Sequence, residues 1–211
     1  MNSLLNNPDG GETSGRQPDS PPPAGTPVLG APSSPKRRGC LIPLLLLVLI
    51  PLAIYGWNYV TLQRKMNDVL KQDPRNKGVD VSTHYKTYVN PNVLVYDLRG
   101  IEGTNSKLDV MRVLLQFAEK VKDEKFDKLE LAFRGETKFL LDGDYFQSLG
   151  REYNFQNPIY TMNHLSENVK RPDGTDAFST WTGGWLGVTT RQTQDFNDFH
   201  DQWYWRSVIS K

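Results

Sequence analysis

The chain has 211 residues, with 25 basic and 24 acidic side chains and a formal net charge of +1 at pH 7. This balance excludes the strong basic field of nucleic-acid-binding domains, so we expect no nucleic-acid partner. Cys40 is the single cysteine, which excludes an intrachain disulfide. The sequence has no phosphate-binding loop, dinucleotide fingerprint or Gly-x-Ser-x-Gly elbow, and we expect no cofactor.

The first segment, residues 1–39, is rich in Pro, Ser, Gly and Asn. Such a composition buries too little apolar surface to offset the conformational entropy lost on ordering. The segment is therefore predicted to be a disordered tail. Its run of three prolines, Pro21 to Pro23, is either a ligand for an aromatic groove of a partner or, as we favour, simply solvated.

An uninterrupted apolar run from Leu41 to Trp57, LIPLLLLVLIPLAIYGW, contains no charged side chain. With Cys40 and residues 58–60 it reaches the roughly 20 helical residues that span a bilayer core of about 30 Å. Its apolar character on every face disfavours a soluble core helix. The long polar segment before it disfavours a cleaved signal peptide. Residues 40–60 are therefore predicted to form a transmembrane helix that contacts the lipid bilayer.

The charges on the two sides of this helix compete to set its orientation. A tight basic cluster, residues 36–38, directly precedes the apolar run, whereas five more widely spaced basic residues follow it: Arg64, Lys65, Lys71, Arg75 and Lys77. We weight the adjacent cluster more and predict a cytoplasmic N-terminus, as the positive-inside rule implies. The long C-terminal part is then the translocated one.

Residues 61–78 continue the helical pattern and then break it. Leu62, Met66 and Val69 recur at helical spacing, and Pro74 begins a breaker segment. This juxtamembrane segment is a stalk or linker, a packing face, or the seam of a weak homodimer, and the spacing does not choose among them. Residues 79–211 are predicted to form one globular domain, a size sufficient for a hydrophobic core.

Within that domain the pattern predicts strands at residues 84–89 and 93–98, joined by a turn at residues 90–92. Ser106, with Asp109 three residues later, predicts a helix N-cap. The helix that follows has an apolar face at helical spacing, made of Val110, Val113, Leu114, Phe117, Ala118 and Val121.

Alternating apolar residues then predict a second hairpin. A three-residue loop pairs Phe133 with Phe139 and Leu131 with Leu141, and we favour it over a two-residue loop that pairs Phe133 with Lys138. Short helices are predicted at residues 145–153 and 159–165 (or an edge strand at the latter), and a final helix at 188–205, around a loop-rich region. The predicted fold class is α+β, a small mostly antiparallel sheet with helices packed on one face, preceded by the transmembrane helix and the disordered tail.

The most enzyme-like cluster is Asp142 and Asp144, with Arg134 across the hairpin. Two carboxylates can divide the roles of general acid and base. Asp-Gly-Asp after a strand is also ordinary turn and helix-cap chemistry, and we favour that interpretation. Asp97 and Arg99, at a strand end, are weaker site candidates for which an internal ion pair is the preferred explanation. The catalytic assignment thus stays unknown.

Aromatic residues supply the other candidates. Trp181 and Trp185 surround a glycine pair and either line a groove for a sugar or peptide or, as we favour, join the core. The three histidines lie far apart and outside any metal-ligand spacing, so we expect no metal site. Residues 203–205 are consecutive aromatics that cannot all face inward on one helix.

Five strings, VYDLRG, LLQFAEKVKDEKFDKLELAFRG, KFLLDGDYFQSLG, TWTGGWLGV and DFNDFHDQWY, resemble a group of uncharacterised bacterial membrane-anchored proteins over about residues 93–204. The resemblance implies a bacterial envelope protein and transfers no activity. We therefore expect a single-pass protein of the bacterial inner membrane with a periplasmic domain.

Two hypotheses for its function follow. The favoured one is a non-catalytic binding or scaffold domain for an envelope protein or a glycan, with Trp181, Trp185 and Arg99 as weak ligand-binding candidates. The alternative is an envelope hydrolase that uses Asp142 or Asp144 with Arg134 or Asp97. The absence of a catalytic motif makes an enzyme the less favoured class.

Overall fold

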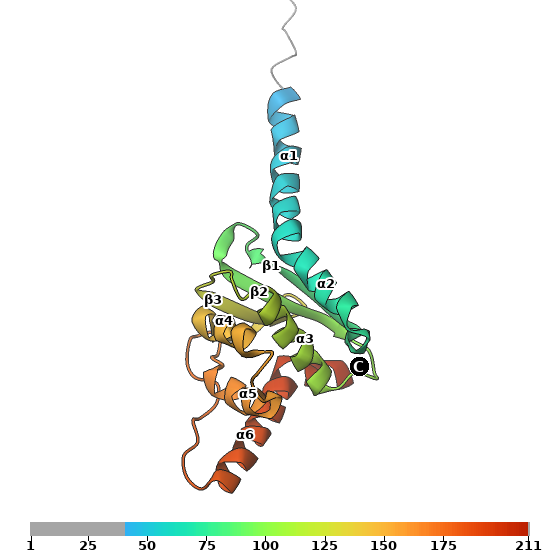
Figure 1. Cartoon of the computed structure of the whole chain (residues 1–211). Coiled ribbons are helices and arrows are strands. Elements are labelled where there is room, and N and C mark those ends of the chain that lie inside the picture. Colours follow the sequence, from blue (N-terminus) through green and yellow to red (C-terminus); the bar gives the residue numbers. More distant parts are fainter. Residues whose placement is uncertain (1–40, 211) are drawn as a thin grey trace, which may run out of the picture. The chain divides into compact units, whose positions relative to one another are not determined.

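A computed structural model describes residues 41–210, so the predicted tail and Cys40 lie outside the described residues. The described part of the chain has an α+β fold with one four-stranded mixed sheet and helices (Figure 1). This result confirms the predicted fold class at that level. Two of the three strand pairings are antiparallel and one is parallel.

The predicted membrane helix begins the described chain. Helix α1 (Leu41–Asn58) continues through a π-helical turn, η2 (Tyr59–Gln63), into α2 (Arg64–Gln72). The stretch Pro43–Gln72 is long and apolar enough to cross a membrane, and 6% of its most apolar window is buried within the protein. A core helix of a soluble protein would be mostly buried, so these features agree with a single-pass membrane protein.

The juxtamembrane segment packs on the domain. Leu62, Met66 and Val69 are at most 3% exposed and belong to the same hydrophobic core as the sheet. The apolar stripe of this segment thus packs against the domain of the same chain. A homodimer through this segment would have to use its exposed side chains, and it stays a prediction.

The sheet has the order β1-β2-β3-β4. Strands β1 (Val79–Lys86) and β2 (Asn90–Ile101) form one antiparallel hairpin, and β3 (Lys128–Phe133) and β4 (Glu136–Asp142) form the other. Helix α3 (Lys107–Lys120) crosses between the parallel strands β2 and β3. A parallel pair needs such a crossover connection.

The first hairpin differs from the prediction in its turn. The strand predicted at residues 84–89 spans Val79–Lys86, because the chain reverses at Thr87 and Tyr88 rather than at residues 90–92. Both turn residues have positive φ, +52° and +63°. Residues 87–89 connect the paired residues Lys86 and Asn90. Positive φ in a hairpin turn is normally supplied by Asn and Gly, so the sequence does not signal this turn.

The predicted register of the second hairpin is wrong. The turn has two residues, Arg134 and Gly135, both with positive φ, and Phe133 pairs with Glu136. A β-bulge between Leu131 and Ala132 then places Phe139 opposite Leu131. The extra residue of the bulge keeps the apolar side chains on one face despite the short turn, a solution that simple alternation does not reveal.

The helix start at Ser106 is confirmed. The Ser106 hydroxyl accepts from the Asp109 amide at 3.3 Å, and the Asp109 carboxylate accepts from the Ser106 amide at 2.7 Å. This reciprocal capping box satisfies two of the amide groups that lack helical partners.

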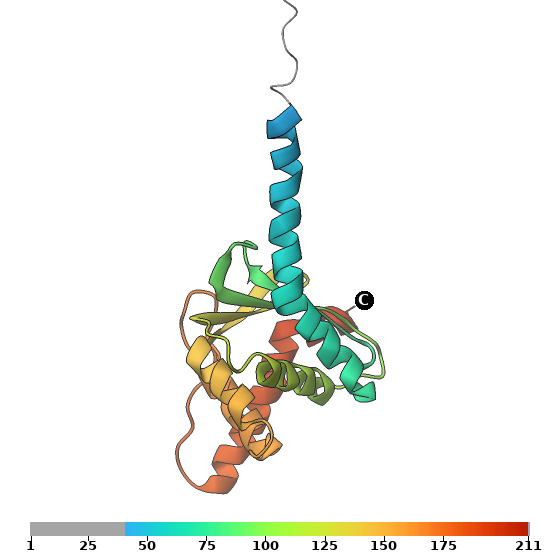
Figure 2. The same cartoon turned by 45° about the horizontal axis from the view of Figure 1, so that its top comes forward.

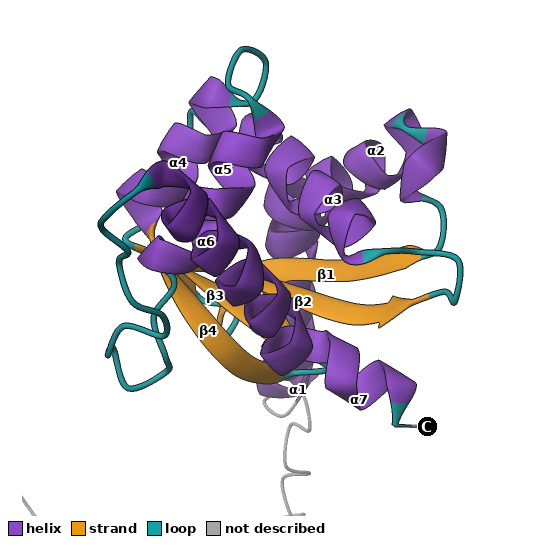
Figure 3. Ribbon diagram, turned by 90° about the horizontal axis from the view of Figure 1, so that it is seen from below, coloured by secondary structure: helices purple, strands orange, loops and turns teal. Residues whose placement is uncertain are grey.

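The remaining helices follow the sheet. They are α4 (Gly143–Glu152), α5 (Pro158–Leu165), η4 (Ser166–Asn168), α6 (Trp185–His200), η5 (Asp201–Trp205) and α7 (Arg206–Ile209). Residues 159–165 are therefore helical rather than an edge strand, and the last helical region begins earlier than the predicted residue 188. Figure 3 shows α6 crossing the sheet over β3 and β4.

The hydrophobic core lies between one face of the sheet and these helices. The Tyr96 ring of β2 lies 6.1 Å from Phe117 of α3 and 5.9 Å from Trp203 of η5. Trp203 and Tyr204 are fully buried, whereas Trp205 is half-buried, as expected for three consecutive aromatics. Both α3 and the last helical region therefore cover the same face.

His200 belongs to this core and is fully buried. Its Nδ1 lies 3.0 Å from the Tyr204 hydroxyl oxygen. Burial lowers the pKa of His200 to about 3, because the charged imidazolium would lose its hydration. The ring is therefore a neutral packing element at physiological pH.

Candidate functional site

Asp142 is the N-cap of α4. Its Oδ1 accepts hydrogen bonds from the amides of Asp144 at 3.0 Å and Tyr145 at 3.4 Å. Both aspartates are exposed. The geometry is that of the cap chemistry favoured from the sequence.

Asp97, Arg99 and Arg134 lie together at the other end of β3. Asp97 is 1% exposed, and its Oδ2 lies 2.8 Å from Nη2 of Arg99. In the register of the sheet, Asp97 lies opposite Ala132 of β3, and Asp142 lies opposite Lys128 of β3. Asp97 and Asp142 are therefore about 13 Å apart along the strand direction. The structure thus brings together Asp97 and the two arginines but keeps Asp142 and Asp144 apart from them.

Two backbone contacts hold this end of the sheet. The Gly135 amide donates to Asp97 Oδ1 at 3.1 Å, and Arg134 Nε donates to the Arg99 carbonyl at 3.3 Å. Asp97 therefore fastens the β3–β4 turn to β2. An internal ion pair with a structural role accounts for all of these contacts.

The two tryptophan candidates have different surroundings. Trp181 is half-buried, its indole Nε1 donates to Asp195 Oδ2 at 2.5 Å, and the Arg191 guanidinium lies 5.2 Å from its ring. Trp185 opens α6 and is 73% exposed, so it is not a core residue. Neither side chain lines the cavities described next.

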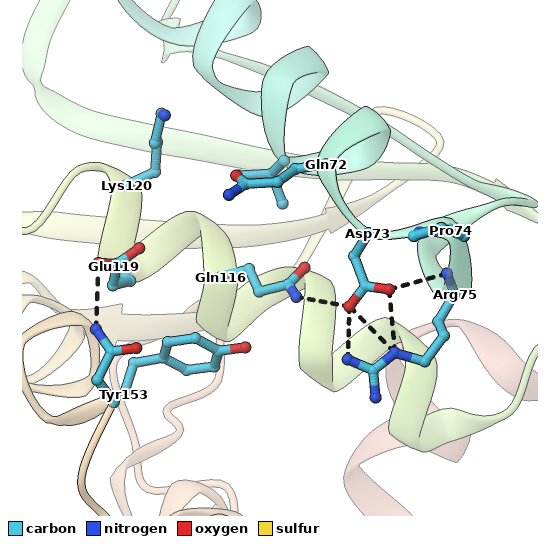
Figure 4. Close-up of a pocket in the computed structure, with 10 residues that line it drawn as sticks. Gln72, Asp73, Pro74, Arg75, Gln116, Glu119, Lys120 and Tyr153 are labelled. Carbon is cyan, nitrogen blue, oxygen red and sulfur yellow. Dashed lines mark hydrogen bonds and ion pairs between the residues drawn. The ribbon is translucent and has the colours of Figure 1, made fainter.

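A polar cavity of about 480 Å³ lies beside α3 (Figure 4). It lies between the end of α2, the outer face of α3 and the end of α4. We call it the polar cavity; its lining residues are Val69, Gln72, Asp73, Pro74, Arg75, Gln116, Glu119, Lys120, Tyr153 and Asn154.

An apolar cavity of about 320 Å³ adjoins it, between α3 and the α4–α5 segment. Its lining residues are Arg75, Leu108, Met111, Arg112, Leu115, Leu149, Tyr153, Gln156, Pro158, Thr161 and Met162. Arg75 and Tyr153 line both cavities. The two cavities therefore share part of their wall, and we call them together the α3 groove.

A hydrogen-bonded network fixes the polar half of the α3 groove. Arg75 binds the Asp73 carboxylate with two nitrogens, Nε at 3.0 Å from Oδ1 and Nη2 at 2.7 Å from Oδ2. Gln116 donates to the same carboxylate at 3.1 Å, and Figure 4 shows both side chains converging on Asp73. The hydrogen bonds from Arg75 hold the pKa of Asp73 well below its usual range, so Asp73 is ionised at physiological pH.

Asn76 extends this network into the core. It is 1% exposed, and its Nδ2 donates to the Val69 carbonyl at 2.9 Å and to Gln116 Oε1 at 2.6 Å. Arg112 donates from Nε to Asn76 Oδ1 at 3.2 Å. These bonds join the end of α2 to α3, so the groove wall is pre-organised.

Gly150 sets the width of the groove. A Cβ built on Gly150 would lie 2.2 Å from the Ala118 carbonyl oxygen of α3. The backbones of α3 and α4 therefore touch directly, and this contact positions Leu149 and Tyr153 at the groove. Only glycine permits so close an approach.

Sequence reasoning missed the α3 groove. One signal was present, because Leu108, Met111 and Leu115 form a second apolar stripe on α3, beside the face that packs on the sheet. Leu108 is 52% exposed while Met111 and Leu115 are buried, as befits the floor and rim of a groove. The segments that complete the groove lie far apart in the sequence.

Among residues 41–210, no three His, Cys, Asp or Glu side chains are grouped so as to hold a metal ion. Comparisons of the chain with protein-family models, with curated proteins and with solved structures find no match.

Proposed function

We propose that this protein is a membrane-anchored binding protein without catalytic activity. Its helix α1 crosses the bacterial inner membrane, its N-terminus is cytoplasmic and its domain is periplasmic. The α3 groove is its ligand site. The single observation that carries this proposal is the junction of a pre-organised polar cavity with an apolar cavity, the usual composition of a binding site.

The chemistry of the groove favours a protein segment over a glycan. The apolar half is lined by Leu and Met side chains, which suit an aliphatic anchor residue. Burying a sugar hydroxyl there without a partner would cost about 1–3 kcal/mol. Arg75, whose side chain is 70% exposed, lies where the two cavities meet and suits an acidic residue next to the anchor. The proposed ligand is therefore an apolar and acidic segment of an envelope protein.

The attachment of the domain to its anchor supports the same function. The helix passes from the apolar run into α2, and Gln63 donates to the Val81 carbonyl at 3.2 Å while accepting from the Thr83 amide at 2.7 Å. These bonds, with the core contacts of α2, hold the domain firmly on the helix. A ligand bound in the groove is thereby kept close to the membrane.

Selection of peptides tests the ligand site. The full chain in lipid nanodiscs is exposed to a library of displayed peptides, and we expect enrichment of sequences with an aliphatic residue beside Asp or Glu. Leu108→Glu places a charge in the apolar half and is expected to weaken binding of selected peptides about tenfold or more, because 1.4 kcal/mol corresponds to a factor of ten.

Leu186→Glu is the matched control, since Leu186 is 67% exposed on α6 and does not line the groove. Its affinity for the same peptides should equal that of the unaltered chain. Enrichment of no peptide above empty nanodiscs, or equal binding by Leu108→Glu, contradicts the proposed site.

Protease treatment of spheroplasts tests the proposed orientation. With an epitope at each end of the chain, external protease is expected to remove the C-terminal epitope and leave the N-terminal one protected by the membrane, because residues 36–38 favour the cytoplasmic side. Lysis before digestion, as the control, exposes both epitopes. Removal of the N-terminal epitope alone from intact spheroplasts would reverse the orientation and exclude a periplasmic partner.

A further inference from the structure

The turn of the β1–β2 hairpin presents apolar side chains to the outside. Tyr88 is 42% exposed and Val89 is 54% exposed. Thr87 and Tyr88 both adopt left-handed backbone conformations, which are unfavourable for a β-branched or bulky residue. We call residues 87–89 the hairpin tip. Such a strained, apolar turn needs surroundings that hold it in place.

Asn58, at the end of α1, supplies that support. Its Nδ2 donates to the Tyr88 carbonyl at 2.7 Å and to the Ile54 carbonyl at 2.8 Å, and its Oδ1 accepts from the Tyr85 amide at 2.8 Å. Asn58 is 3% exposed, and its side chain binds the backbone both before the turn, at Tyr85, and within it, at Tyr88. The hairpin tip is thus clamped to the last turn of the membrane helix, and Figures 1 and 2 show the hairpin beside the end of α1.

Aromatic rings surround this clamp. The Trp57 and Tyr85 rings lie 4.9 Å apart, and the His84 and Tyr88 rings stack at 4.4 Å. A cavity of about 260 Å³ lies between helix and hairpin, with Tyr55, Tyr59, His84 and Tyr88 among its lining residues. Tyrosine and tryptophan are enriched where hydrocarbon meets the lipid headgroups, because their rings are apolar and their edges polar.

The length of α1 places the contact between Asn58 and the hairpin tip at the level of the lipid headgroups. Its 18 residues from Leu41 to Asn58 carry no charge and rise by about 27 Å in total, close to the thickness of a bilayer core. The tip meets the helix at Asn58, the last residue of this span. Lys86, the charged residue next to the tip, is paired with Glu130 on the sheet.

We propose that the hairpin tip inserts into the headgroup region of the same bilayer that α1 crosses. Tyr88 and Val89 are its apolar contacts. The domain then has two attachments to the membrane, the helix and the tip, and the second one prevents it from rotating freely about the helix axis. The inference depends on α1 spanning a bilayer and is independent of the ligand of the α3 groove.

Fluorophore labelling in membranes tests this contact. In a Cys40→Ser background, which removes the single cysteine, bimane is attached at Val89→Cys and the full chain is reconstituted in phosphatidylglycerol–phosphatidylethanolamine vesicles. We expect lipids with a nitroxide near the headgroup to quench most of the fluorescence, and iodide in the water to quench little. Asn90→Cys, an exposed position beside the tip, provides a second label site.

Glu136→Cys is the matched control. It is an exposed residue next to the other hairpin turn, which lies at the opposite end of the sheet because β2 and β3 run parallel. Its label should show the reverse pattern, with strong quenching by iodide and little by the nitroxide lipid. Labels at residues 89 and 90 that both behave like the label at residue 136 would overturn the proposal.

Discussion

Replacing Trp203 with alanine is expected to lower the free energy of unfolding of the domain by about 3–5 kcal/mol. Trp203 is fully buried, and its rings lie within 5.4 Å of Phe199 and 5.9 Å of Tyr96. Its indole Nε1 also donates to the Ala132 carbonyl on β3 at 3.0 Å. The truncation leaves a cavity and removes this hydrogen bond at once, and the total free energy of unfolding of domains of this size is only about 5–15 kcal/mol.

Urea unfolding of the full chain in detergent micelles, followed by near-ultraviolet circular dichroism, measures this effect. Trp185→Ala is the control, because Trp185 is 73% exposed and its loss is expected to change stability by less than about 0.5 kcal/mol. Equal destabilisation by the two variants would show that Trp203 does not join the last helical region to the sheet.

Replacing Gly150 with alanine is expected to lower the free energy of unfolding by about 1–3 kcal/mol, in the range of overpacked cores. The added Cβ would lie 2.2 Å from the Ala118 carbonyl oxygen and 2.5 Å from its carbonyl carbon. Backbone atoms cannot move aside as a flexible side chain can, so α4 must shift away from α3. Because Leu149 and Tyr153 move with α4, peptide binding in the α3 groove should weaken as well.

Gly187→Ala is the matched control for the same urea measurement. Gly187 lies within α6, and a Cβ built there meets no atom within 4 Å. Alanine should therefore stabilise the helix by about 0.5–1 kcal/mol, since it loses less backbone entropy than glycine. Stabilisation by Gly150→Ala as well would contradict the direct contact of the two helix backbones.

Features that depend on neighbouring residues were predictable. The capping box at Ser106 and the apolar face of α3 each lie within a few turns of helix, and both agree with the structure. The register of the second hairpin was not predictable, because the bulge at Leu131 and the left-handed turn at Arg134 compensate for each other. Alternation of side chains alone does not distinguish that pair of irregularities from a longer loop.

In the candidate site, too, local features were predictable from the sequence and features built from distant residues were not. Asp142 was recognised as cap chemistry, because an N-cap is recognisable from the residues that follow it. The α3 groove was not recognised, because Asp73, Gln116 and Tyr153 come from separate elements that meet only after folding. Arg75 attracts no notice in the sequence, yet it lies where the polar and apolar cavities meet.

By itself, the sequence determined that this protein has one long charge-free helix and an α+β domain, since both follow from composition and local periodicity. Only the tertiary structure decided that the long apolar helix continues into the core of the domain, where Leu62 and Met66 are buried. It also decided that Asn58 holds the β1–β2 hairpin against that helix. Contacts between distant residues depend on how complete elements pack together, and no local pattern specifies that packing.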